Sequence, residues 1–155
     1  MAFFVPTGLG IGTNVETHPD QLASHAQAMQ TLGARWSYSW GRLPVGPNYM
    51  PSLFPEARGV MTATELCAWR NAMISAGQQW DQLTWTFCNE PEASGKTPLD
   101  LTRLITAQLA QFALANIRLR IVFPNNNINT QASFDYGVEA FQRVRQAGVL
   151  VSPGV

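Results

Sequence analysis

Short apolar runs alternate along the chain with longer segments whose apolar residues recur at helical spacing, and successive runs lie roughly 30 residues apart. The six short runs predict β-strands over Phe3–Leu9, Ala34–Trp40, Tyr49–Phe54, Leu83–Cys88, Leu119–Phe123 and Val149–Ser152. The longer segments between them predict helices. A repeated strand-then-helix order is typical of an α/β fold with a mostly parallel sheet and right-handed crossover connections.

The first two predicted helices have clear start and stop signals. Pro19 stands near the first position of the first helix, and Gly33 follows its last apolar residue as a C-terminal stop. The second helix begins with a capping box, in which Thr62 is followed three positions later by Glu65, and it ends at Gly77. The connection between residues 41 and 48 is rich in Pro and Gly and predicts no helix.

The last two predicted helices are bounded in the same way. Thr97 is the expected N-cap of the third, with Pro98 at its first position, and the fourth runs from about Ser133 to Gly148. One apolar face of each helix is expected to point inward. These faces consist of Leu22, Ala26, Met29 and Leu32; Leu66, Trp69 and Met73; Leu101, Leu104, Ile105, Leu109 and Phe112; and Val138, Phe141 and Val144.

Two architectures fit this order of elements, a doubly wound open sheet and a (β/α)8 TIM barrel. The barrel typically needs about 250 residues, and the 155 residues here supply about five to six βα units. The segment Gly8–Gly12 lacks the G-x-G-x-x-G spacing, which weakens the nucleotide-binding version of the open sheet. We therefore expect one domain over residues 1–155 with an α/β fold, and both architectures remain open from these observations. If the fold is TIM-barrel-like, it is incomplete in this chain.

The composition narrows the classes of function. Hydrophobic residues make up 46% and charged residues only 13%, which favours strands buried on both faces. Ten basic and ten acidic residues cancel and form no basic stripe, so no nucleic-acid partner is expected. The apolar runs are much shorter than the ~20 residues of a membrane helix, and Met1–Val5 has no positively charged n-region of a signal peptide.

Metal and thiol chemistry have little support. His18 and His25 are the only histidines, and no third ligand stands at a suitable spacing, so we expect neither a metal nor another cofactor. Cys67 and Cys88 show no motif spacing. Buried thiols are the favoured interpretation of these two residues, and a disulfide between them remains the alternative.

The strongest chemical signal is the segment Trp85–Glu92, which begins as an apolar strand and ends in Asn89-Glu90-Pro91. Barrel enzymes carry their catalytic groups at the carboxyl ends of the strands, and Pro91 cannot continue a strand ladder. Glycosidic cleavage uses two carboxyl groups, of which the acid needs a partly apolar setting. Glu90 is therefore the candidate acid/base and Asn89 its substrate-binding neighbour; the alternative is a strand-ending turn with a solvated Glu.

Aromatic and amide side chains are candidates for binding the sugar. Trp36, Tyr38 and Trp40 alternate along one predicted strand and so share a face. We expect Trp36 to fill the core and Trp40, with Tyr38, to stack on sugar rings. Asn14 after the first strand and Asn125 after the fifth, with its neighbour at position 126, are candidates for binding the sugar at the same end of the strands. Asn at loop ends is, however, often only a turn-former.

Three segments, in order along the chain, resemble a known enzyme family. Trp85–Glu92 resembles the acid/base strand of clan A glycoside hydrolases, which closes in Asn-Glu-Pro. Gly33–Gly41 and Tyr49–Phe54 resemble the second and third strands of the alkali-sensitive-linkage-protein-like catalytic cores, which include the family 128 β-1,3-glucanases. The resemblance covers roughly residues 3–124. It implies a barrel, an extracellular retaining hydrolase, a β-glucan-like polysaccharide or oligosaccharide substrate and Glu90 as the acid/base.

The family's nucleophile, a Glu at the end of the seventh strand, has no match in this chain. The other candidates, Glu56, Glu65, Glu92 and Glu139, stand on other elements. We therefore expect weak or no hydrolysis by the chain alone, and self-association through open barrel edges. Two alternatives remain: a non-catalytic carbohydrate-binding protein, and an unrelated small α/β ligand-binding domain in which Val149–Val155 is a closing edge strand.

Overall fold

A computed structural model of the chain describes residues 8–13, 19–39, 48–80, 83–122, 130–149 and 151–152. In this part the protein is a mixed α/β fold with parallel sheets, which confirms the predicted class. The strands are β1 (Gly10–Thr13), β2 (Trp36–Ser39), β3 (Tyr49–Met50), β4 (Ser52–Leu53), β5 (Thr84–Phe87), β6 (Arg120–Val122) and β7 (Val151–Ser152). The helices are η1 (Pro19–Gln21, a 3-10 turn), α1 (Leu22–Leu32), α2 (Pro55–Arg58), α3 (Ala63–Ser75), α4 (Pro98–Leu114) and α5 (Gln131–Gln146).

The strands are arranged in the order in which they occur along the chain. One sheet has the order β1-β2-β3 and the other β4-β5-β6-β7, and every pair is parallel. Only Pro51 separates β3 from β4, so one extended segment joins the two sheets. Pro51 has no N–H for the ladder, but its carbonyl oxygen accepts a hydrogen bond from the Thr86 N–H at 3.0 Å. Among the described residues the strands form two open sheets and not a closed barrel.

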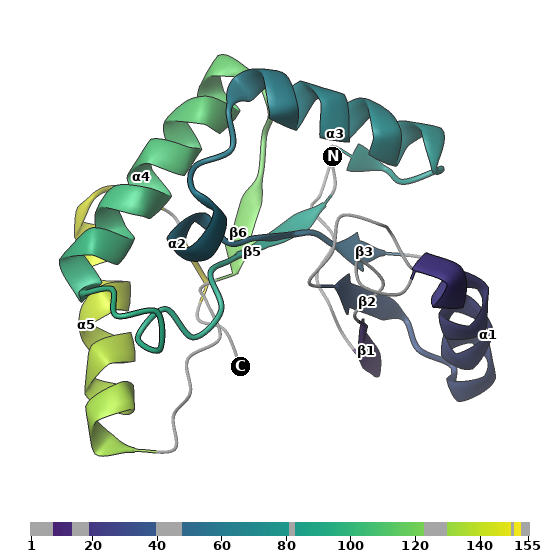
Figure 1. Ribbon diagram of the computed structural model, residues 1–155, viewed down its shortest axis with the longest axis horizontal. Coiled ribbons are helices and arrows are strands. Elements are labelled where there is room, and N and C mark those ends of the chain that lie inside the picture. The colour runs from purple at the N-terminus through teal and green to yellow at the C-terminus, as the bar shows by residue number, and fades with distance from the viewer. Residues whose placement is uncertain are drawn as a thin grey trace.

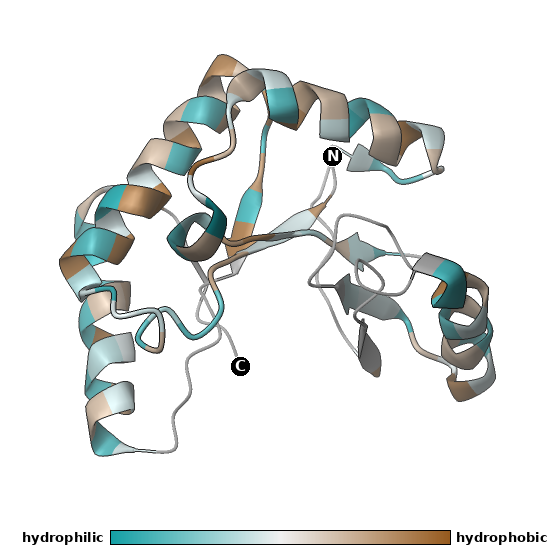
Figure 2. Ribbon diagram, in the orientation of Figure 1, coloured by the Kyte–Doolittle hydropathy of each residue, from teal (hydrophilic) through white to brown (hydrophobic). Residues whose placement is uncertain are grey.

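The long helices lie around the outside of the strands (Figure 1). In Figure 2, α3 and α4 each carry apolar segments interleaved with polar ones, as expected for helices with one buried side. Trp85 of β5 is fully buried beneath these helices and meets Trp69, Trp80 and Phe112 edge-on, with ring centroids 5.2, 5.0 and 5.0 Å away. Edge-on packing is the favoured geometry for aromatic rings, so this cluster fixes β5 against α3 and α4.

The opposite face of the strands carries hydroxyl groups. Side chains alternate along a strand, so Thr86 points away from the helices that Trp85 and Phe87 contact. Ser52 of β4 is the register partner of Thr86, and their hydroxyl oxygens lie 2.8 Å apart. At Ser52 and Thr86 the sheet is therefore polar on the side that faces away from the helices.

Two strand predictions need correction. Residues 3–7 of the first predicted strand lie outside the described part, while Gly8 and Leu9 precede β1, which forms over Gly10–Thr13. Gly8 has φ 78°, a left-handed conformation that a strand does not accommodate. The third predicted strand is interrupted at Pro51 and stops at Leu53, because Pro55 starts the short helix α2, which the sequence did not predict.

The helix boundaries agree with the start and stop signals. Thr62 and Thr97 each form a complete capping box, with Glu65 and Asp100 as the reciprocal carboxylates. Gly33 ends α1 in the left-handed conformation, with φ 66°. The connection predicted without a helix falls mostly on residues outside the described ranges. Within those ranges, no helix has both the length and the apolar character that crossing a bilayer demands.

Three side chains predicted to face the core do not. Leu32 is 60% exposed and Ala26 is exposed, because α1 contacts its neighbours through a narrow stripe around Met29. Val138 is 41% exposed because α5 turns the side bearing Ala140 inward. Residues i and i+2 of a helix point in directions roughly 200° apart, so Val138 and Ala140 cannot share the buried side.

Candidate carboxylate site at the end of β5

β5 delivers Asn89 and Glu90 to the carboxyl edge of its sheet. The strand runs between β4 and β6, and the Cys88 N–H donates to the Leu53 carbonyl oxygen at 2.7 Å. The backbone then takes a left-handed conformation at Cys88 (φ 67°) and again at Glu90 (φ 46°). Glu90 is therefore the third residue after a buried parallel strand, and it is half-buried.

A compact turn follows Glu90 and fixes its carbonyl group. The Ala93 N–H donates to the Glu90 carbonyl oxygen at 2.9 Å, and the Ser94 N–H donates to the Pro91 carbonyl oxygen at 3.2 Å. Pro91 is buried. The chain therefore leaves the strand through a hydrogen-bonded turn rather than through a loosely held loop.

A second carboxyl group, that of Glu56, lies beneath this turn. Its Oε1 accepts a hydrogen bond from the Asn89 N–H at 2.9 Å, and the Cys88 thiol also hydrogen-bonds this carboxyl group. Glu56 is only 9% exposed, and its Oε2 is buried without a hydrogen-bond partner among the described residues. The site thus contains one half-buried carboxyl group, Glu90, and one buried carboxyl group that holds the adjacent backbone.

Sequence reasoning placed Glu56 on another element and missed its contact with Asn89. The usable signal was Pro55, which favours the first position of a helix directly after a predicted strand. In a parallel sheet the carboxyl ends of neighbouring strands lie at the same edge. A carboxylate just after β4 is therefore close to the residues that follow β5.

Burial and nearby carboxylates raise the pKa of three side chains near this edge. Burial raises the pKa of the Cys88 thiol well above its usual value, and the charge of Glu56 raises it further. Burial also raises the pKa of Tyr38; a hydrogen bond to Ser52 opposes that shift and Glu56 adds to it. The pKa of Tyr136 is raised, first by burial and then by the charge of Glu92. Burial is thus the main cause of all three shifts, and nearby carboxylates add to each of them.

The predicted sugar-binding residues divide into described and undescribed positions. Tyr38 lies in β2 on the same face as Met50, its register partner, and is half-buried. Asn89 is half-buried, and its backbone N–H is committed to Glu56. The other three predicted contacts, Trp40, Asn14 and Asn125, lie outside the described residues.

Trp36, which was expected in the core, is half-buried instead. Its indole Nε1–H donates to the Gly8 carbonyl oxygen at 3.1 Å. The neighbouring Ser37 is the register partner of Tyr49, which is buried in the main core cluster. Alternation therefore turns Trp36 to the face away from that cluster.

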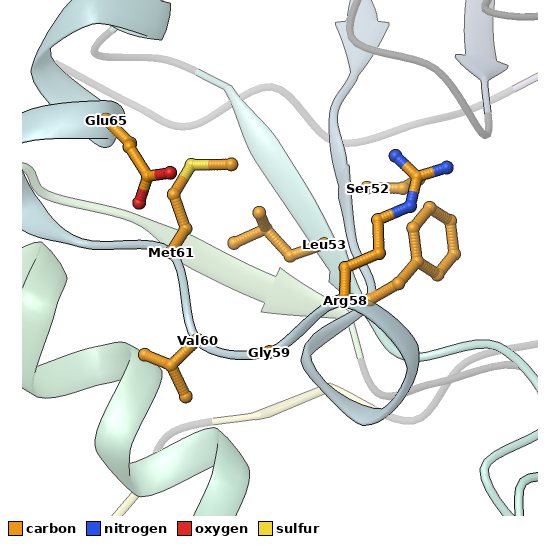
Figure 3. Close-up of a pocket in the computed structure, with 8 residues that line it drawn as sticks. Ser52, Leu53, Arg58, Gly59, Val60, Met61 and Glu65 are labelled. Carbon is orange, nitrogen blue, oxygen red and sulfur yellow. The ribbon is translucent and has the colours of Figure 1, made fainter.

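A small cavity lies beside α2 (Figure 3), and Glu90 is not among the residues that line it. Its volume is about 60 Å³, which has room for water molecules rather than for a sugar ring. The lining residues are Ser52, Leu53, Phe54, Arg58, Gly59, Val60, Met61 and Glu65. This cavity is therefore not the candidate sugar site.

Metal ligands do not cluster in the part of the chain that the structure describes, where no three His, Cys, Asp or Glu side chains gather in a suitable arrangement. Cys67 and Cys88 are free thiols, so the alternative of a disulfide between them is wrong. Comparison of the chain with protein-family models, with curated proteins and with solved structures gave no match. Inference about function therefore rests on the sequence motifs and on the geometry of this edge.

Proposed function

We propose that this chain forms part of a glycoside hydrolase barrel of the clan A type, with Glu90 as its acid/base and a β-glucan as its substrate. One observation carries the proposal. Glu90 is the third residue after the buried parallel strand β5, at the edge where barrel enzymes keep their catalytic groups. The Asn-Glu-Pro segment that contains it is the part of the chain that most resembles this clan.

The order of the strands supports the barrel part of the proposal. In a (β/α)8 barrel, neighbouring strands follow chain order and the helices form an outer ring. In a doubly wound sheet, the strand order reverses at a switch point. The two described sheets follow chain order throughout, with the helices on the outside and hydroxyl groups on the other face.

The proposed chemistry uses Glu90 twice. Its carboxyl group donates a proton to the glycosidic oxygen while the bond from that oxygen to the anomeric carbon breaks and a nucleophile bonds to that carbon. As a carboxylate it then accepts a proton from the water molecule that attacks the same carbon and displaces the nucleophile. Tyr38 lies on the face of β2 that it shares with Met50 and belongs to the proposed sugar-binding surface, which also includes Asn89.

A retaining enzyme needs a second carboxylate as the nucleophile, about 5–5.5 Å from the acid/base. Glu56 is unsuited to this role because it is buried and its Oε1 is held by the Asn89 N–H. Glu56 therefore does not supply the partner of Glu90, and no other described residue is assigned to that role. We expect slow cleavage that accelerates when a small external nucleophile such as azide attacks the anomeric carbon.

The test compares the chain with its Glu90→Gln variant on β-1,3- and β-1,4-glucan oligosaccharides, with and without sodium azide. The chain should cleave at least one of them in the presence of azide, and Glu90→Gln should lower that rate by about 100-fold or more. Glu139→Gln is the matched control, because Glu139 lies on α5 and pairs with Arg143 on the surface at 2.7 Å. Equal rates for the chain and for Glu90→Gln contradict the role of Glu90.

Carbohydrate binding without turnover is the second candidate function. It is favoured by the burial of Glu56, which leaves the half-buried Glu90 without that carboxylate as a reaction partner. Calorimetric titration with the same oligosaccharides separates the two functions. Binding that Glu90→Gln leaves unchanged, with no cleavage in azide, supports the binding role.

A further inference from the structure

The turn that presents Glu90 is conformationally unfavourable. Cys88 and Glu90, on either side of Asn89, both have positive φ angles of 67° and 46°. Residues other than Gly rarely adopt a positive φ angle, and such a backbone conformation persists only where the surrounding structure holds it. Some contact outside the turn must therefore maintain the direction in which Glu90 leaves the strand.

The segment formed by β4 and α2 supplies that contact. The Leu53 carbonyl oxygen accepts from the Cys88 N–H at 2.7 Å, and Glu56 Oε1 accepts from the Asn89 N–H at 2.9 Å. The Cys88 thiol hydrogen-bonds the same carboxyl group. Two successive backbone N–H groups of the turn are thus held by residues only three positions apart.

We propose that Glu56 is a positioning residue, whose buried carboxylate holds Asn89 and so orients Glu90 toward the substrate. The inference rests on the proposed function, because it assigns Glu56 to the site in which Glu90 is the acid/base. Glu56 itself does not contact the substrate, since it is 9% exposed and its Oε1 is already engaged.

A role in stability alone accounts poorly for this side chain. Oε2 of Glu56 is buried and has no hydrogen-bond partner among the described residues, an arrangement that costs stability. Gln at this position keeps an oxygen for the Asn89 N–H and carries no charge. If Glu56 positions the turn, Glu56→Gln should therefore keep the hydrogen bond to the Asn89 N–H, and Glu56→Ala should lose it.

The first measurement follows the Asn89 amide by NMR in ¹⁵N-labelled protein and needs no enzymatic activity. In the unaltered chain and in Glu56→Gln, the amide proton should exchange slowly and resonate downfield. In Glu56→Ala it should exchange at least about 10-fold faster and move upfield, because its acceptor is gone. Glu56→Asp, which withdraws the carboxylate by one methylene, is the second variant and should give an intermediate result.

The second measurement is azide-assisted cleavage of the glucan oligosaccharide. Glu56→Ala should lower kcat by about 10- to 100-fold with little change in KM, and Glu56→Gln should restore most of the rate. The double variant Glu56→Ala/Glu90→Gln should be no slower than Glu90→Gln alone, because the two residues act as one unit. Glu65→Ala is the matched control, since Glu65 Oε2 accepts from the Thr62 N–H at 2.8 Å at the start of α3.

The outcomes separate this inference from the proposed function. An Asn89 amide that Glu56→Ala leaves unchanged overturns the positioning role, and so does an equal loss of rate in Glu56→Ala and Glu65→Ala. A chain that cleaves no glucan, yet loses the protection of the Asn89 amide in Glu56→Ala, refutes the proposed function and leaves the hold of Glu56 on the turn in place.

Discussion

At the scale of single residues, the pKa of the Cys88 thiol responds to its burial and to the charge of Glu56. Its folded-state pKa is raised above the usual 9.0 by burial and by Glu56. A raised pKa contributes stability that is fully present below the unfolded-state value and is lost as the pH rises through the folded-state value. The free energy of unfolding should therefore fall above about pH 9, as measured by urea denaturation between pH 7.5 and 10.5.

The matching variants are Cys88→Ser and Cys67→Ser. A Ser hydroxyl does not ionise in this range, so Cys88→Ser should flatten the fall between pH 9 and 10. Cys67→Ser is the control that also replaces one thiol, at a position on α3 rather than on the turn after β5. Tyr38 and Tyr136 also have raised pKa values, and they act in the same direction at higher pH in every variant. Identical pH profiles for Cys88→Ser and the unaltered chain refute the assignment.

At the scale of elements, the capping box of α4 should contribute measurably to stability. Thr97 Oγ1 accepts from the Asp100 N–H at 3.1 Å, and Asp100 Oδ2 accepts from the Thr97 N–H at 3.2 Å. Thr97→Ala removes the first bond and should lower the free energy of unfolding by about 1 kcal/mol in urea denaturation at pH 7.

Thr106→Ala is the control for that measurement, because it removes the same atoms from the same helix. The Thr106 hydroxyl donates only to the Thr102 carbonyl oxygen within α4, at 2.9 Å, and is exposed. Its removal should change the free energy of unfolding by less than about 0.5 kcal/mol. Equal losses for Thr97→Ala and Thr106→Ala contradict a stabilising cap.

Local signals in the sequence predicted the helix starts, whereas contacts between elements decided the rest. The caps at Thr62 and Thr97 depend on residues three positions apart, so the sequence alone revealed them. The exposure of Val138 depends on which side of α5 meets α4. The contact of Glu56 with Asn89 depends on the register between β4 and β5, which no local pattern specifies.

At the scale of the whole molecule, the sheets end in unpaired edges. Within the part of the chain that the structure describes, β1 and β7 each pair with a single strand. Parallel edge strands with open hydrogen-bonding groups favour self-association. Light scattering coupled to size-exclusion chromatography should therefore show a molar mass that rises above the 17.1 kDa of the chain as the concentration increases. A monomer at every concentration contradicts this expectation.

The proposed acid/base role of Glu90 is tested most directly by varying the leaving group in the presence of azide. When a glucan oligosaccharide is cleaved, the leaving group is a sugar hydroxyl, which needs a proton to depart. When a 2,4-dinitrophenyl β-glucoside is cleaved, 2,4-dinitrophenolate departs without a proton. If Glu90 is the acid, Glu90→Gln should slow cleavage of the oligosaccharide by about 100-fold or more and change cleavage of the aryl glucoside by less than about 3-fold. An equal effect on both substrates, or no effect on either, contradicts the account.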